Sequence, residues 1–266
     1  MNNFKKIMYI FFRIILPIFL IITISIRAYT FVTVKELEIF LIQINFENIS
    51  PEHPRRIITA IIILCLWAMY YCFNRKIKQD LIPDTLYGSI PYFILWFSSV
   101  FLGIKEIHLK LKPIPLQFKI LKNHNCFNII EDKIPSEDCD YVYKDDNKES
   151  DTINLVIGDT YEITKDKLPK STMCNRTIIV KRKDNKNNRR FYSENLIKKI
   201  ANIINSLKKE HKEYNLFFNT NSKTNKELYY NVFNTGRDDF ILNIYNANSK
   251  NKFIFNDKPS IKIKNN

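Results

Sequence analysis

Two short polar segments carry side chains that suit ligand binding. One follows Gly158 and the other follows the apolar residues Leu216–Phe218. Amides, hydroxyls and an ammonium just before a helix N-terminus can hold a phosphate or carboxylate, and ligands of open α/β sheets bind beyond the carboxyl ends of strands. If the preceding strands are parallel, both segments lie at one sheet edge. We therefore predict a site for an anionic small molecule, for example a nucleotide, formed by Asp159, Thr160, Tyr161, Asn219, Thr220, Asn221, Ser222 and Lys223.

Two alternatives compete with this ligand site. Asn, Thr and Ser side chains commonly satisfy a turn and cap the following helix, so residues 219–222 can serve the fold alone. Asp159 at a strand end can also act as a base, which leaves a membrane-bound hydrolase or transferase as an alternative function. We assign no catalytic residue, because none of the four histidines falls in a recognisable catalytic motif.

Metal and cofactor motifs are missing from the sequence. Cys126, Cys139 and Cys174 with His124 offer four nominal zinc ligands, but no Cys-x-x-Cys pair occurs and the spacings match no familiar zinc site. The acidic residues 131–151 lack the spacing of a calcium loop. Only four glycines occur, which excludes a P-loop and a dinucleotide-binding turn. The sequence therefore predicts no metal and no cofactor.

A basic stretch over residues 165–199 is the second chemical feature of the polar part of the chain. It carries twelve positive and three negative side chains. Such a projection can bind the anionic inner leaflet of a membrane or nucleic acid phosphates, with a solvated hairpin tip as the alternative. We expect lipid rather than nucleic acid as its partner. The residues of this predicted basic surface are Lys181, Arg182, Lys183, Arg189 and Arg190.

Three apolar runs predict a membrane domain over residues 1–104. They cover residues 7–26, 57–73 and 85–104. A helix of about 20 residues spans roughly 30 Å, the thickness of a hydrocarbon core, so the second and third runs qualify as transmembrane helices. The first contains Arg13 and Pro17, so it either spans the membrane or lies on its surface. It lacks the small-residue cleavage site of a secretory signal. Two or three spans are therefore expected.

The apolar runs predict an integral protein of the cell membrane, and the Lys and Arg residues that flank them predict a cytoplasmic C-terminal domain. With three spans and the N-terminus inside, five flanking Lys and Arg would lie inside and nine outside, so the opposite orientation is favoured. If only residues 57–104 span the membrane as a hairpin, eleven lie inside and three outside, which also puts residues 105–266 in the cytoplasm. Arg13 is the predicted functional residue of the membrane part, where it would pair with an acidic residue on another helix or subunit.

The polar remainder predicts a small α/β or α+β domain over residues 152–266, preceded by an extended exit and acidic linker over residues 105–151. Ser193 is expected to cap a helix with a single apolar face ending at Leu207. A second helix is expected over residues 226–233. Because helices lie between strands, the sheet should be partly parallel. The predicted strands cover residues 153–157, 177–182, 216–218, 240–245 and 252–255.

This architecture resembles that of bacterial membrane effectors that sense a signalling nucleotide and then perturb the membrane. The resemblance is one of architecture, and no residue motif carries it. It implies an integral membrane sensor or effector, with the bilayer, an anionic ligand and a second copy of the membrane helices as partners. The alternative is a structural or scaffold subunit of a membrane assembly that docks a partner protein or anionic lipid.

Overall fold

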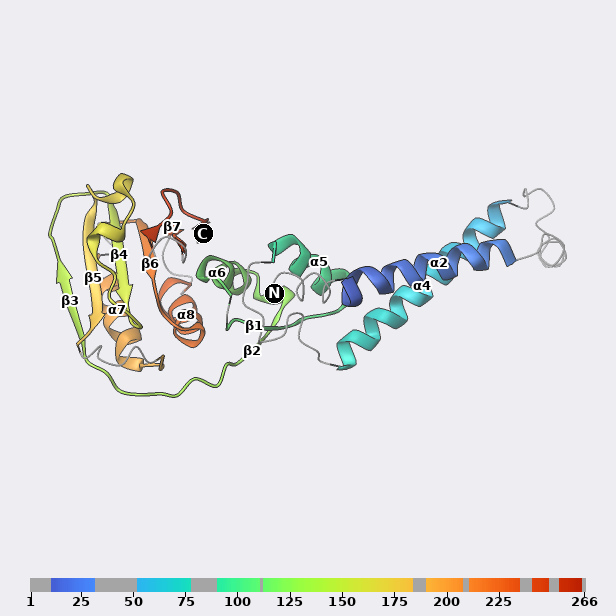
Figure 1. Cartoon of the computed structure of the whole chain (residues 1–266), viewed down its shortest axis with the longest axis horizontal. Coiled ribbons are helices and arrows are strands. Elements are labelled where there is room, and N and C mark those ends of the chain that lie inside the picture. The colour runs from blue at the N-terminus through green and yellow to red at the C-terminus, as the bar shows by residue number, and fades with distance from the viewer. Residues whose placement is uncertain are drawn as a thin grey trace. The chain divides into compact units, whose positions relative to one another are not determined.

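The chain divides into two compact units, residues 1–107 and 108–266. The first is built from helices, and the second surrounds a β-sheet (Figure 1). The boundary falls within the short strand β1 (Glu106–His108). The computed structural model describes residues 11–31, 52–77, 90–110, 112–183, 190–207, 211–234, 241–248 and 254–264.

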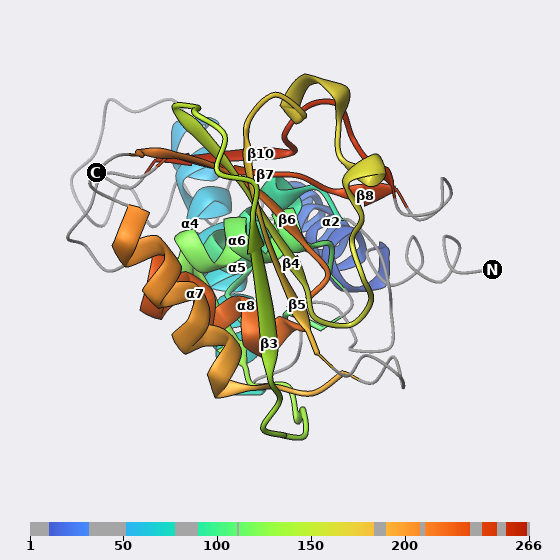
Figure 2. The same cartoon turned by 90° about the vertical axis from the view of Figure 1, so that its left-hand side faces the viewer.

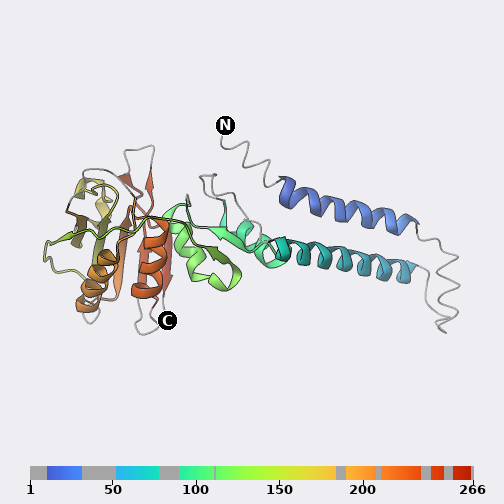
Figure 3. The ribbon, with the colours of Figure 1, turned by 90° about the horizontal axis from the view of Figure 1, so that it is seen from below.

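The helical unit contains two long helical segments that lie side by side and run in opposite directions (Figures 1 and 3). The first joins the π-helical turn η1 (Phe11–Ile15) to α2 (Leu16–Phe31), and the second is α4 (Glu52–Ile77). The Tyr70 hydroxyl of α4 donates a hydrogen bond of 2.8 Å to the carbonyl of Arg13. The predicted charge pairing of Arg13 with another subunit stays a prediction.

A third helix, α5 (Tyr92–Leu102), packs against α4 and ends at a left-handed glycine. Gly103 has a φ of 72°, a conformation that costs other residues about 1–2 kcal/mol. A Cβ atom on Gly103 would lie 2.7 Å from the carbonyl oxygen of Tyr71. The Trp67 indole N–H also donates to the Phe101 carbonyl at 2.7 Å. Glycine at this position therefore permits the close approach of α4 and α5.

No helix in the described part of the chain has the length and sustained apolarity needed to cross a membrane. The predicted apolar run 57–73 lies inside helix α4. Residues 11–26 of the first run are helical, and residues 7–10 are not described. A single helix over 85–104 is wrong, because α5 begins only after Pro91. The apolar centre and alternating ends of residues 35–46 predict a strand or a short membrane-surface element, and this segment lies outside the described residues.

The second unit is built on a six-stranded sheet in the order β10-β7-β6-β4-β5-β3. The four central strands are mutually parallel, and the two edge strands are antiparallel to their neighbours, which confirms the expected partly parallel sheet. The strands are β3 (Tyr141–Asp145), β4 (Thr152–Gly158), β5 (Arg176–Arg182), β6 (Glu213–Phe218), β7 (Ile241–Ile244) and β10 (Ile261–Lys264).

Each face of the sheet has its own apolar cover (Figure 2). On one face Phe218 packs on Phe118 of α6 (Ile114–Lys122), beside α8 (Ser222–Leu228) and η5 (Tyr229–Phe233). On the other, Phe217 stacks on Tyr245 and meets Phe255 of the hairpin β8 (Ala247–Asn248) and β9 (Ile254–Phe255). The alternation of strand side chains sends Phe217 and Phe218 to opposite faces.

Helix α7 (Glu194–Leu207) confirms the predicted amphipathic helix after Ser193. The six residues of its predicted apolar face, Leu196, Ile197, Ile200, Ile203, Ile204 and Leu207, are all buried. The predicted cap is wrong in its chemistry, because the Ser193 hydroxyl is buried and makes no hydrogen bond with the described residues. Burial of the apolar face, at about 25 cal/mol per Å², is thus the main local reason for this helix.

Residues 105–151 differ most from their predicted extended and acidic linker form. They contain α6, β3, the short strand β2 (Asn128–Ile130) and the 3-10 turn η2 (His124–Cys126). Helix α6 starts directly after Pro113 and has Pro115 in its first turn, where a missing N–H costs nothing. Prolines that suggested an extended segment therefore begin a helix.

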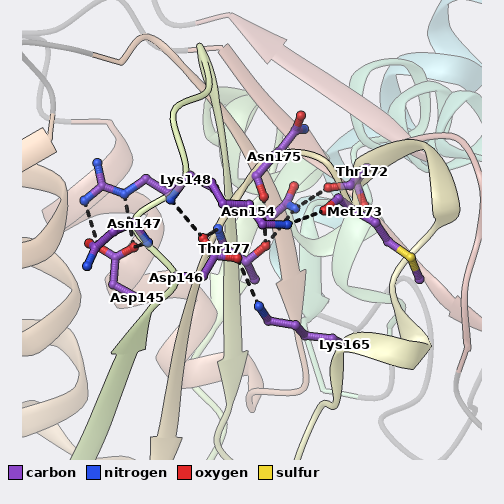
Figure 4. Close-up of polar contacts among 11 residues, drawn as sticks. Asp145, Asp146, Asn147, Lys148, Asn154, Lys165, Thr172, Met173, Asn175 and Thr177 are labelled. Atoms are coloured by element: carbon purple, nitrogen blue, oxygen red, sulfur yellow. Dashed lines mark hydrogen bonds and ion pairs between the residues drawn. The ribbon is translucent and has the colours of Figure 1, made fainter.

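A row of three buried amides and one hydroxyl, called the amide row here, crosses the four parallel strands in register. The Asn215 amide donates to Asn154 Oδ1 at 2.9 Å, and the Asn243 amide donates to Asn215 Oδ1 at 3.0 Å. At the β5 end of the row, the Asn154 amide donates to the hydroxyl of Thr177 at 3.2 Å and to the carbonyl of Thr172 at 2.6 Å (Figure 4). Because a one-residue slip would break these contacts, the row specifies the strand register.

Candidate functional site

The two predicted ligand-binding segments meet at the carboxyl-end edge of the sheet, because β4 and β6 are parallel neighbours. Asn219 joins them: its side-chain oxygen accepts from the backbone N–H groups of Asp159 at 2.7 Å and Thr160 at 3.1 Å. The Thr160 hydroxyl donates to the Asn219 carbonyl at 2.8 Å, and the Asn219 amide donates to the Tyr161 carbonyl. The structure therefore brings together residues that only this topology makes neighbours.

The residues that follow Asn219 make side-chain hydrogen bonds to the first turn of α8. Asn221 is the N-cap residue: its side-chain oxygen accepts from the Thr224 N–H at 2.9 Å, and its amide donates to the Phe191 carbonyl at 2.8 Å. The Thr220 hydroxyl donates to the Asn225 side chain. These contacts are those expected if the segment serves the fold, and they leave Lys223 as its most available charged group. The predicted polar loop is also shorter than expected, because the helix begins at Ser222.

Lys223 lies half-buried at this edge, with its ammonium 4.5 Å from the centroid of the Tyr192 ring. A small hollow opens beside it, and its charged lining consists of three carboxylates and two ammonium groups, from Glu131, Asp132, Glu227, Lys223 and Lys226. The contact with the ring attracts the ammonium without neutralising its charge. Among the residues predicted for the ligand, Lys223 is the one with a positive side chain.

A buried ion pair lies at the same edge of the sheet, between the end of β5 and the turn after β4. Arg182 Nη2 lies 2.6 Å from Asp159 Oδ1, and the Tyr141 hydroxyl donates to the same oxygen at 2.8 Å. The guanidinium stacks on the Phe191 ring, 4.0 Å from its centroid. Asp159 Oδ2 is buried and makes no hydrogen bond with the described residues. Arg182 and Tyr141 are thus part of the site, and both face each other across the β3–β5 register.

The run of basic residues predicts that Arg182 lies on a basic surface, and this prediction is wrong. The Arg182 side chain is 3% exposed. Of its predicted companions, Lys181 pairs with Glu162 at 2.7 Å, Lys183 and Arg190 are exposed, and residue 189 lies outside the described part. The alternation of β5 turns Arg182 inward, a signal that was available from the strand pattern but was masked by the run of basic residues.

Burial and neighbouring charges shift the pKa values of Tyr141, Arg182 and Cys139 at this site. Burial raises the pKa of the Tyr141 hydroxyl, and the adjacent Asp159 carboxylate raises it further. Burial disfavours the charged form of Arg182, but the neighbouring Asp159 outweighs it, so the pKa of Arg182 is raised. Burial also raises the pKa of the Cys139 thiol. Tyr141 therefore stays protonated at neutral pH and acts as a hydrogen-bond donor to Asp159.

A second polar cluster lies at the opposite, amino-end edge of β4 and β5 (Figure 4). Arg176 donates twice to Asp145, at 3.1 and 2.8 Å, and Lys165 donates to Asp146 at 3.0 Å. Asp146 also accepts from the Thr177 N–H at 2.8 Å. The carboxylates of the predicted acidic linker therefore anchor the β3 edge to its neighbours, a structural role that composition did not indicate.

The two units define the class of the protein: an apolar helical segment joined to a mixed α/β domain with a polar strand-end site. Residues 1–261 match the family described as the SMODS- and Ubiquitin system-associated 2TM effector domain, SUa-2TM. The chain belongs to this family. Its description makes the protein a membrane-integral effector with two transmembrane helices, the lower of the two numbers predicted from sequence. No curated protein matches the chain.

Proposed function

We propose that the α/β unit binds an anionic small molecule, such as a nucleotide, at the carboxyl-end edge of its sheet, and that binding acts on the membrane through the transmembrane helices. The observation that carries this proposal is the meeting of the Asp159–Tyr161 and Asn219–Lys223 loops at one edge. Helices α7 and α8 both follow strands that end at this edge, so their N-termini add positive potential there.

The charges at the edge are mixed. Arg182 offsets Asp159, and Lys223 and the exposed Arg190 are the positive groups in neighbouring parts of the chain, while Glu131, Asp132 and Glu227 line the hollow beside Lys223 and oppose an anion there. Lys223 would contact the anionic group. Asn219 would hold the two loops together through its hydrogen bonds to the N–H groups of Asp159 and Thr160. Ligand binding at this edge is the usual behaviour of parallel α/β sheets.

The membrane part of the proposal assigns the two spans to the runs 7–26 and 57–73. Together they form a helical hairpin, so the segments on its two ends share one side of the membrane. That side would carry Lys and Arg at positions 5, 6, 75, 76 and 78, against positions 27, 35, 55 and 56 on the other. This small excess of flanking Lys and Arg favours a cytoplasmic position for the α/β unit under the positive-inside tendency.

A binding titration of the full chain in lipid nanodiscs tests this function. The probes are mononucleotides, linear dinucleotides and cyclic dinucleotides, each at about 50 and 200 mM salt so that counterion release is recognised. Saturable binding at the higher salt is expected for at least one probe, with about tenfold loss in Lys223→Ala. Lys199→Ala is the matched control, because its ammonium lies 5.7 Å from the Tyr143 ring, away from the strand-end loops. Absence of binding by all probes would contradict the proposal.

A scaffold role is the second candidate, and one observation favours it. Asn219, Thr220, Asn221 and Ser222 already satisfy one another or their neighbours. If the edge takes no ligand, the exposed Lys183 and Arg190, which lie between β5 and α7 in the chain, would dock anionic lipid or a partner instead. Salt-labile binding of the nanodisc-free protein to phosphatidylserine vesicles, equal for all nucleotide conditions, would support this second role.

A further inference from the structure

The Asn219–Lys223 loop is linked by buried hydrogen bonds to the first segment of the α/β unit. This segment, residues 108–117, directly follows the membrane unit in the chain and is called the connector here. The Thr220 hydroxyl donates to Asn225, the Asn225 amide donates to Gln117 Oε1 at 2.9 Å, and the Gln117 amide donates to the Lys112 carbonyl at 2.8 Å. Three consecutive hydrogen bonds therefore join the loop to the connector.

A second link reaches the same segment from Ser222, two residues after Thr220 in the loop. The Ser222 hydroxyl donates to Asp132 Oδ2, which also accepts from the Lys110 backbone N–H at 2.9 Å. The other oxygen of this carboxylate lies 3.3 Å from His108 Nδ1. The Asp132 side chain is only 5% exposed. Asp132 therefore joins Ser222, at the start of α8, to His108 and Lys110 of the connector.

Both links run through a region that has apolar packing of its own. Phe118 lies next to Gln117 and meets the rings of Phe218 and Tyr229. Asn225 has 0% and Gln117 has 4% of its surface exposed. Apolar side chains would stabilise such an interface at least as well, whereas satisfied buried amides restrict it to one arrangement. The polar links therefore specify how α8 sits on α6 and the connector.

We propose that these two links couple the ligand-binding loop to the connector, so that displacement of the loop moves the chain where it leaves the membrane unit. This inference concerns the regulation of the site and rests on the function proposed above. A shift of Thr220 removes the hydrogen bond to the side-chain oxygen of the buried Asn225, and a shift of Ser222 removes one of the contacts of the Asp132 carboxylate, so each movement has a free-energy cost. The buried Asn225 and Gln117 are accordingly positioning residues.

Hydrogen exchange of the full chain in nanodiscs tests the coupling without any ligand. The amides of Lys112 and Gln117 donate to Leu109 and Pro113 carbonyls inside the connector. Thr220→Val is expected to speed exchange of peptides covering residues 108–117 by about fivefold or more. Peptides of β5, which are remote from both links, should not change, and this separates local coupling from global destabilisation.

A matched variant and a double variant complete the test. Asn123→Ala removes an exposed hydrogen bond at the end of α6 and should leave connector exchange unchanged. Gln117→Leu with Asn225→Leu keeps the packing volume but removes the first link, so adding Thr220→Val to it should have no further effect on the connector. Unchanged connector exchange in Thr220→Val, or an additive effect in the triple variant, would overturn the coupling.

Failure of the coupling and failure of the proposed function are distinguishable. If no nucleotide binds but Thr220→Val alters connector exchange, the links exist and the ligand proposal is wrong. If a nucleotide binds and connector exchange responds neither to it nor to Thr220→Val, the site is real and the coupling is wrong. With both correct, Gln117→Leu/Asn225→Leu should retain nucleotide affinity within about twofold and reduce the ligand-induced change in connector exchange, because only the Ser222–Asp132 link remains.

Discussion

Arg182 and Asp159 form a buried ion pair of 2.6 Å that ties the end of β5 to the turn after β4. Both side chains are nearly inaccessible to solvent, at 3% and 1% exposure. Tyr141 adds a third contact from β3, so three strands are joined at the carboxyl-end edge of the sheet. The pair therefore holds the Asp159–Tyr161 loop against a part of the sheet that Asn219 does not reach.

Removing only the arginine should destabilise the α/β unit strongly. Arg182→Met strands a buried carboxylate, and loss of one partner of a buried pair costs about 3–5 kcal/mol. The double variant Arg182→Met/Asp159→Asn removes that charge and should recover a large part of the loss. Thermal unfolding in detergent, followed by circular dichroism, measures both. Equal losses in the single and double variants would contradict a role for the stranded charge.

The stabilising effect of Asp145 should depend on pH. The hydrogen bonds from Arg176 hold the pKa of Asp145 below its usual value, despite partial burial. A lowered folded-state pKa contributes stability above the unfolded-state value of about 3.9, and this is lost as pH falls through the folded-state pKa. Asp145→Asn should therefore lower the Tm at pH 6 and have a smaller effect at pH 3. Asp138→Asn, at an exposed position, is the control and should show no such change.

The amide row across the sheet should depend most on its central member. Asn215→Ala removes the donor to Asn154 and the acceptor for Asn243, and each buried group left unsatisfied costs about 1–3 kcal/mol. Hydrogen exchange in β4 and β7 should increase together. Asn231→Ala, which removes an exposed contact with Glu227, should leave those strands unchanged. Increased exchange confined to β6 would contradict a continuous row.

Glycine at position 103 should be required for the packing of α5 on α4. Gly103→Ala places a methyl group against the Tyr71 carbonyl in a left-handed conformation that costs about 1–2 kcal/mol. The hydrogen bond from Trp67 to the Phe101 carbonyl should then break, which would shift tryptophan emission. Val100→Ala, at an exposed position of the same helix, should leave the emission unchanged. An unchanged spectrum in Gly103→Ala would contradict this packing.

The elements best predicted from sequence are those with strong apolar periodicity. Helix α7 and strand β4 follow directly from their buried residues, because hydrophobic spacing selects one regular structure at these lengths. Strand β10 was not predicted, because alternating Ile and Lys with few neighbours is a weak signal. The Pro113 and Pro115 pair was interpreted as extended, although proline is equally compatible with the first turn of a helix.

By itself the sequence determined the division into an apolar N-terminal part and a basic α/β part, as well as the residue types at two strand ends. Only the tertiary structure decided that Asp159 faces Arg182 and that Thr220 connects through Asn225 to Gln117. The physical reason is that apolar periodicity is a local property, whereas charge pairs and amide contacts depend on strand order and register. Partners such as Asn225 and Gln117, 108 residues apart, meet only once the core has placed their elements together.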